Sequence, residues 1–267
     1  MPALLSSSSV EEYTGLLSKR ASNTALQVNA TQRTTIIVAC VYAVVIVILW
    51  SFPILNYIIY PFKLLTVGFH EASHAIVGLC TGARIESITL EPNEGGVTRM
   101  RGGIPHLSLP AGYLGSSLIG AALIACGFDE RASKIASIVV GVFFLLTLWW
   151  ARRDWLTWVL IIGMAGLIVA FWFIADSVAL RYLILFIGVM NSLYSLWDIL
   201  DDLVFRKVNE SDATAFSKLV GGAPQCWGVI WFIISMCFFA CGIIIGIVAF
   251  KASASEQKAD KFLDVGT

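Results

Sequence analysis

The sequence predicts an all-α polytopic membrane protein with six or seven transmembrane helices and one small β-hairpin. Composition is the first observation behind this class: of 267 residues, 58% are hydrophobic and 13% are charged, whereas soluble domains carry roughly 25% charged residues. The mean hydropathy is +0.81. These values exclude a soluble single-core enzyme and a disordered protein. The balance of 18 Lys and Arg against 18 Asp and Glu also argues against a nucleic-acid partner.

The second observation is a series of long apolar segments. They lie at residues 35–60, 64–81, 107–127, 134–150, 155–175, 181–200 and 227–250. A span needs roughly 20 apolar residues, and most of these segments qualify. Backbone groups in lipid must bond internally, so we expect helices. The first segment is long enough to tilt or to break at Pro53, which leaves the count at six or seven.

The third observation is a change of pattern at residues 84–101. Apolar and β-branched residues alternate there around a Pro-Asn-Glu-Gly-Gly turn, which predicts a β-hairpin. The remaining chain divides by composition. We expect a disordered polar tail at 1–33, a transmembrane bundle at 34–250, and a short soluble tail at 251–267. The polar stretch 201–226 could cap the bundle.

The segment at 64–81 carries the chemistry. It contains His70-Glu71-Ala72-Ser73-His74, a match to HExxH that arises by chance on the order of once in a thousand such chains. On a helix the two histidines share one face, so both can bind one zinc ion while Glu71 reaches a water on the metal. Ionisable groups in a membrane helix are costly and are tolerated when they face a cavity and share a cation.

A catalytic zinc site needs a third protein ligand and one open position. Cys80 and His106 are possible, but His106 follows Pro105 in an expected loop. The acidic residues of the sixth apolar segment are better placed, and we expect Asp198 to be the third ligand. Asp201 lies one turn further on, and with Asp202 it could equally be a solvated helix end.

These motifs resemble the site-2 proteases, intramembrane zinc metallopeptidases, in their compact peptidase-M50B-like branch. The resemblance covers residues 64–127 and 188–230. Its matching positions are His70–Ala75, Gly78, the hairpin end Glu94–Thr98, and the small-residue stretch Pro110–Ser117. The resemblance implies His70, His74 and Asp198 as zinc ligands and Glu71 as general base.

The family's distal motif has Asn and Pro ahead of Asp-Gly. Here no Pro follows Asn191 and Ile199 follows Asp198, so Asp198, Asp201 and Asp202 all stay open as the ligand.

The resemblance further implies a membrane-spanning protein substrate, contact with membrane lipid, and an internal membrane such as the ER or Golgi. The hairpin could bind an unwound substrate strand by β-addition, or could simply connect two helices. Asn191 could position the substrate or a water, or could serve helix packing. Two other functions are open: a metal transporter using the same cluster, and a silent relative that binds membrane clients.

Overall fold

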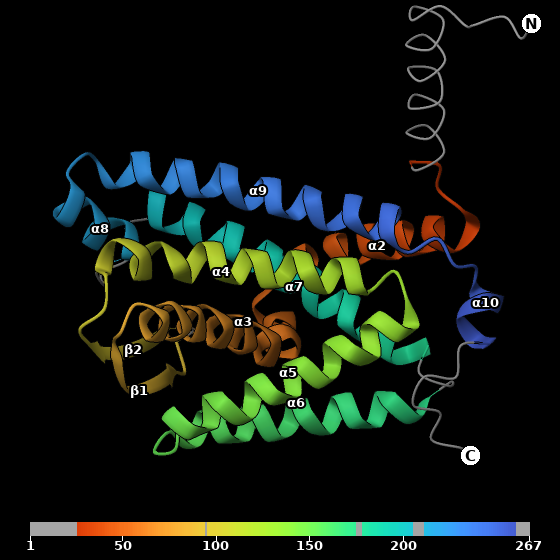
Figure 1. Cartoon of the computed structure of the whole chain (residues 1–267), viewed down its shortest axis with the longest axis horizontal. Coiled ribbons are helices and arrows are strands. Elements are labelled where there is room, and N and C mark those ends of the chain that lie inside the picture. The colour runs from red at the N-terminus through yellow and green to blue at the C-terminus, as the bar shows by residue number, and fades with distance from the viewer. Residues whose placement is uncertain (1–25, 94, 175–177, 205–210, 260–267) are drawn as a thin grey trace, which may run out of the picture.

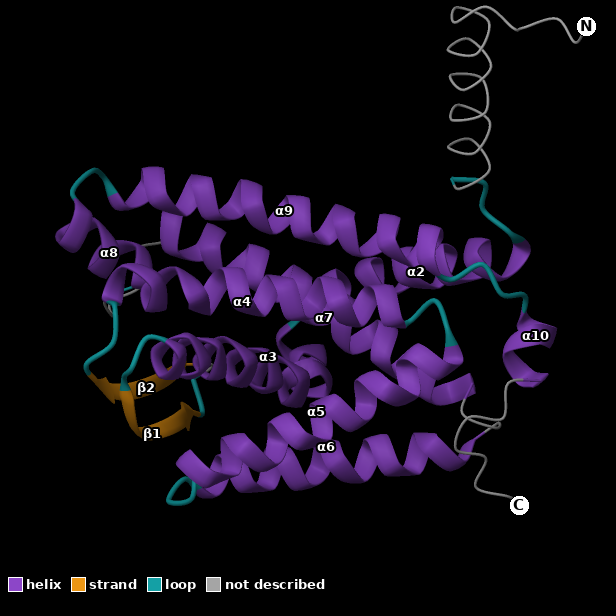
Figure 2. Ribbon diagram, in the orientation of Figure 1, coloured by secondary structure: helices purple, strands orange, loops and turns teal. Residues whose placement is uncertain are grey.

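The computed structural model describes residues 26–93, 95–174, 178–204 and 211–259, and is a helical bundle with one two-stranded sheet (Figure 2). The elements in chain order are α2 (Ala30–Ser51), α3 (Pro53–Cys80), β1 (Arg84–Glu91), β2 (Gly95–Arg101), α4 (Pro105–Cys126), α5 (Glu130–Trp150), α6 (Trp155–Phe173), α7 (Val178–Val204), α8 (Asp212–Val220), α9 (Pro224–Ala249) and α10 (Ala254–Ala259). Within the described ranges, six helices are long and apolar enough to cross a membrane: α2, α4, α5, α6, α7 and α9. The chain is therefore an integral membrane protein of the predicted class.

The first predicted segment breaks before Pro53. Phe52 is extended, with φ −106° and ψ 120°, because a residue that precedes proline is disfavoured in the helical region. One helix thus ends at Ser51, and the next begins at Pro53 and continues through the HExxH motif to Cys80. The segment predicted at 64–81 is consequently the second half of the longer helix α3.

The two tails differ in part from the expected boundaries. Residues 1–25 of the predicted disordered tail lie outside the described residues. Helix α2 already begins at Ala30, four residues before the predicted bundle, because Asn29 and Gln32 form a capping box with bonds of 2.8 and 3.1 Å. In the C-terminal tail, the short helix α10 occupies Ala254–Ala259, and residues 260–267 lie outside the described residues.

Helices α3, α4 and α7 form the centre of the bundle, with α9 along one side and α5 and α6 along the other (Figure 1). Glycines allow α4 and α7 to approach closely. A Cβ on Gly188 would lie 2.6 Å from the backbone nitrogen of Ile124, and one on Gly120 would lie 2.4 Å from the Ser192 hydroxyl. Small residues at such contacts are typical of membrane helix pairs.

The hairpin lies at the same end of the bundle as α8 (Figure 1). Its strands pair antiparallel, with Ile88 opposite Thr98 and Leu90 opposite Gly96. The α5–α6 loop lies against β1, where the backbone N–H of Leu90 donates to Asp154 at 2.9 Å. The hairpin is therefore held between α3 and this loop.

Gly188→Ala tests the close contact between α4 and α7. The added methyl would meet backbone atoms, which cannot rotate away, so we expect the free energy of unfolding to fall by about 1–3 kcal/mol. Thermal unfolding of the purified protein in detergent measures this change. Gly163→Ala on α6 is the matched control, because its Cβ would meet no atom within 4 Å. Equal effects from both variants would contradict this packing.

Candidate metal centre

Helix α3 presents the two histidines of the HExxH motif to a common point. His70 and His74 lie one turn apart on the same face, and their Nε2 atoms are 3.0 Å from each other. Most of the surrounding helix, from Leu64 to Ala75, is buried. The rings are thus held inside the bundle.

Helix α4 fixes the orientation of His74. The backbone carbonyl of Ser108 can only accept a hydrogen bond, so the Nδ1 atom of His74, 2.6 Å away, is the donor. A neutral imidazole with its proton on Nδ1 has a lone pair on Nε2. Such a contact is typical of metal-binding histidines, because it sets both the ring orientation and the tautomer.

Gly112 of α4 makes room for both rings. A Cβ at this position would lie 2.3 Å from Nε2 of His70 and 2.4 Å from Nε2 of His74. Any other residue here would fill the space between the two nitrogens. The close approach of α4 to α3 therefore depends on this glycine.

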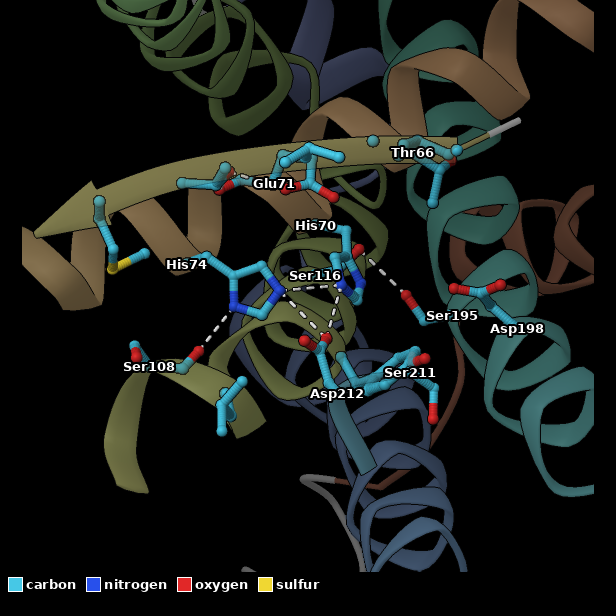
Figure 3. A pocket seen from close by; sticks show the side chains of 18 of the residues that line it. Thr66, His70, Glu71, His74, Ser108, Ser116, Ser195, Asp198, Ser211 and Asp212 are labelled. Carbon is cyan, nitrogen blue, oxygen red and sulfur yellow. Dashed lines mark hydrogen bonds and ion pairs between the residues drawn. The ribbon is translucent and has the colours of Figure 1, made fainter. Parts of the chain in front are cut away.

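Helix α8 supplies a carboxylate to the same point. The Oδ2 atom of Asp212 is 3.0 Å from Nε2 of His70 and 3.1 Å from Nε2 of His74 (Figure 3). Asp212 is the first residue of α8, after the N-cap Ser211, whose hydroxyl accepts from the N–H of Thr214 at 3.3 Å. An acidic residue in the first turn is also favoured by the helix dipole.

Aromatic packing holds α8 in this position. The ring of Phe216 lies 5.5 Å from that of Trp231 on α9, and Trp231 lies 5.7 Å from Tyr113 on α4. Tyr113 in turn packs edge-on against His70, with ring centres 4.7 Å apart. One aromatic cluster thus connects the helix that carries the carboxylate to the helix that carries the histidines.

The electrostatics of Asp212 follow from these neighbours. Burial by itself would raise the pKa of this carboxyl. When the histidines are protonated, the attraction of His74 and hydrogen bonds from both rings act in the opposite direction and outweigh burial, so the pKa is held below its usual range. The side chain is therefore a carboxylate anion at neutral pH, as a metal ligand must be.

The three side chains fit a tetrahedral cation. Two imidazole nitrogens and a carboxylate oxygen face one another with pairwise separations of 3.0–3.1 Å. Ligand atoms around a zinc ion, with bonds of roughly 2.0–2.1 Å, lie about 3.3 Å apart. The cluster therefore needs to open by only a few tenths of an ångström. Among the described residues, this is the one group of three or more His, Cys, Asp or Glu side chains close enough to share an ion.

Glu71 lies beside this cluster and is held by strand β2. The hydroxyl of Thr98 is 2.7 Å from Oε2 of Glu71 and 2.9 Å from the Glu71 backbone oxygen. Gly96 leaves room for the side chain, because a Cβ there would lie 2.7 Å from Oε1. Glu71 is only 6% exposed. Its carboxylate is therefore positioned by contacts with the hairpin.

A cavity of about 540 Å³ opens over these groups. Polar side chains from α7, including Ser195 and Asp198, line one side of this cavity (Figure 3). Both histidines, Glu71 and Asp212 also line the cavity. The space is large enough for several waters or for a short stretch of extended chain.

The structure brings together three of the predicted site residues, namely His70, His74 and Glu71. Asp198 lines the same cavity on α7 but lies outside the group that could share an ion, in which Asp212 takes the third place. Asp201 is not among the described residues that line the cavity, and the side chain of Asp202 lies outside the described residues.

The remaining candidates lie away from the cluster. Asn191 is fully buried between α7 and α4, where it donates to the Ser116 carbonyl at 2.7 Å and accepts from the Ser116 hydroxyl at 3.0 Å. Cys80 is exposed at the end of α3. His106 is exposed in the first turn of α4, and the expectation of a loop there was wrong, because Pro105 starts that helix at its first position.

Sequence reasoning did not identify Asp212. The candidates for the third ligand were acidic residues within apolar segments, whereas Asp212 lies in the polar stretch 201–226. The usable signal was local: Ser211-Asp212 just ahead of Ala213 and Phe216 is a helix start with an acidic first turn. Because the stretch 201–226 was expected to cap the bundle, a helix that starts there with an acidic residue could have been expected near the histidines.

Comparison with known proteins gives one result. A family model described as Peptidase M50B-like matches residues 38–242, which include every residue of the cluster. No curated protein and no solved structure gives a significant match.

Paired variants distinguish the two aspartates as metal ligands. We expect Asp212→Asn to lower zinc affinity by more than the roughly 10–100-fold that losing an outer-shell contact costs. Asp198→Asn should leave the affinity unchanged, because its carboxylate is outside the cluster. Metal content after dialysis against chelators of graded strength measures both. Loss of zinc from Asp198→Asn with retention by Asp212→Asn would contradict the assignment.

Proposed function

The chain belongs to the Peptidase M50B-like family, and we propose that it is an intramembrane zinc endopeptidase that cleaves membrane-spanning protein substrates. The single observation that carries this proposal is the arrangement of Glu71 and the group His70, His74 and Asp212 around one cavity inside a bundle of membrane helices. A protein that only carries a metal needs the three metal-ligating side chains and no more. A hydrolase also needs a carboxylate placed to move a proton.

His70, His74 and Asp212 would hold the zinc ion at the wall of the cavity. Zinc in such a site lowers the pKa of bound water to about 7 and polarises a carbonyl. Ser108 sets the tautomer of His74 through its carbonyl, and Gly112 keeps the space between the rings clear. Asp198, which the sequence suggested as a ligand, lines the same cavity on α7.

Glu71 would act as the general base. Its carboxylate takes a proton from the attacking water and then gives it to the nitrogen of the departing amine, so that the peptide bond is replaced by an acid and an amine. Thr98 donates to Oε2 and holds the group in place, while Oε1 remains able to accept the proton. Asn191 on α7 forms two hydrogen bonds with Ser116 on α4, which lines the cavity. These bonds would hold α4 and α7 together beside the site.

Strand β2 offers an edge to an unwound substrate. The N–H of Leu90 points away from β2, to Asp154, so Leu90 and Gly96 form a pair whose backbone groups point outward on both strands. By the same alternation, the N–H and C=O groups of Gly96 and Thr98 point away from β1. Within the described residues, neither forms a backbone bond with another element. Both line the cavity, so β-addition here would bring a substrate strand beside Glu71.

Glu71→Gln tests the enzyme against the alternative functions. We expect peptide cleavage to fall by at least the 10²–10⁴-fold typical of losing a general base, while zinc stays bound, because Glu71 is not one of the three donors. The assay uses proteoliposomes with a mixture of single-span peptides and detects products by mass spectrometry. A change in zinc flux instead of cleavage would favour a transporter. Client binding without any product that depends on Glu71 would favour a silent relative.

Gly96→Ala tests the hold of the hairpin on the base. Its methyl would lie 2.6–2.9 Å from three atoms of the Glu71 side chain, so the carboxylate must move. We expect kcat to fall roughly tenfold or more, since displacements of about 1 Å can cost 10²-fold, with zinc content unchanged. Gly95→Ala is the matched control, because its nearest contacts are 3.3 Å or longer and involve other side chains. Equal losses in both variants would contradict this role of β2.

A further inference from the structure

A second cavity, of about 250 Å³, lies on the other side of the hairpin. It is lined by β1, by Arg99 of β2, and by the α5–α6 loop with Arg152 and Arg153. Ser87 lies opposite Arg99 in the sheet, and both are on the face that points away from Glu71 and Thr98. We call this cavity the arginine groove. It shares no lining residue with the cavity over the histidines.

The three arginines of the groove are exposed and form no ion pair with any described residue. Two carboxylates also line the groove, and both are engaged elsewhere. Glu86 pairs with Arg101, and Asp154 accepts from the N–H of Leu90, the N–H of Leu156 and the Thr157 hydroxyl. Within the described part of the chain, the positive charge of these arginines is therefore not neutralised by an ion pair.

The groove lies where a bilayer surface must be. The α5–α6 loop is four residues long and connects two candidate spans, so it cannot be far from the interface. Trp149 and Trp155, on either side of the loop, are each 71% exposed. Tryptophans at this level are typical of the boundary between hydrocarbon and headgroups.

From this we infer that the arginine groove binds the phosphate group of an anionic ligand, with an acidic phospholipid headgroup as the expected source. Guanidinium groups bind phosphate oxygens in pairs of parallel hydrogen bonds, and three unpaired arginines around one cavity provide such donors. Ser87 and Thr89 line the same space, where the Ser87 hydroxyl can donate as well, whereas the Thr89 hydroxyl donates to the Val97 carbonyl at 3.4 Å. The headgroups of acidic lipids lie at the membrane surface, where the loop places these arginines.

A bound phosphate would connect the hairpin to the helical bundle. Arg99 belongs to β2, whereas Arg152 and Arg153 belong to the loop between α5 and α6. The direct polar contact between loop and hairpin described above is the bond from Leu90 to Asp154. Phosphate held by arginines of both elements would add a second connection. The binding site stands on its own residues and does not depend on the proposed peptidase activity.

Lipid binding to the delipidated full-length protein tests this site. Native mass spectrometry compares adducts of phosphatidic acid with those of phosphatidylcholine of the same chain length. We expect Arg99→Gln, Arg152→Gln and Arg153→Gln each to lower affinity for phosphatidic acid about fivefold, as expected for one arginine at a lipid surface. Arg33→Gln is the matched control, because Arg33 is an exposed arginine near the start of α2, and this end of α2 lies far from the hairpin (Figure 1).

A competition arm identifies the source of the phosphate. Displacement of phosphatidic acid by millimolar glycerol 3-phosphate would show that the groove takes soluble phosphate esters too, and lack of displacement would assign the site to the bilayer. The inference is overturned if none of the three variants weakens binding, or if Arg33→Gln weakens it equally. It is also overturned if a glutamate-rich juxtamembrane peptide binds through these arginines while phosphatidic acid does not.

Discussion

The structure depends on the meeting of two imidazoles and one carboxylate inside a membrane bundle. Each ionisable group costs a few kcal/mol at the centre of a membrane helix unless it is compensated. Here the costs are shared, because the Nε2 atoms of His70 and His74 and the Oδ2 atom of Asp212 lie within 3.1 Å of one another. The neighbouring helices must follow this geometry. Gly112 lets α4 approach the rings, and the aromatic cluster around Trp231 brings α8 to the same place.

The hairpin has two edges with different roles, and this asymmetry orients the site. The edge of β1 is closed by Asp154 from the α5–α6 loop, whereas the outward backbone groups of β2 face the cavity. The same strand holds Glu71 through Thr98. A strand that joined this edge would therefore lie beside Glu71, and a shift of the hairpin would move both together. In the proposed peptidase, positioning of substrate and general base through one element would make their relative geometry insensitive to small motions of the bundle.

Much of this architecture was predictable from sequence, because the relevant signals are local. Apolar segments of about 20 residues, the turn around Pro92, and His70-Glu71 with His74 each follow from nearby residues. The break before Pro53 is a local steric effect as well. The third donor is different, since Asp212 is 138 positions after His74 and reaches it only through the packing of α8 on α4 and α9. Spacing could not rank Asp212 above Asp198, because both lie near the ends of helices and only the fold brings one to the histidines.

The place of Asp212 on a short helix has a thermodynamic consequence. Helix α8 has nine residues, fewer than an isolated helix needs to be stable in water. Its order must come from the packing of Phe216 and from the bonds of Asp212 to the histidines. A cation that binds all three donors would favour the docked helix, and the docked helix would in turn complete the site. Assembly of the metal centre and closure of this end of the bundle are then one equilibrium, and a ligand that stabilises either stabilises the other.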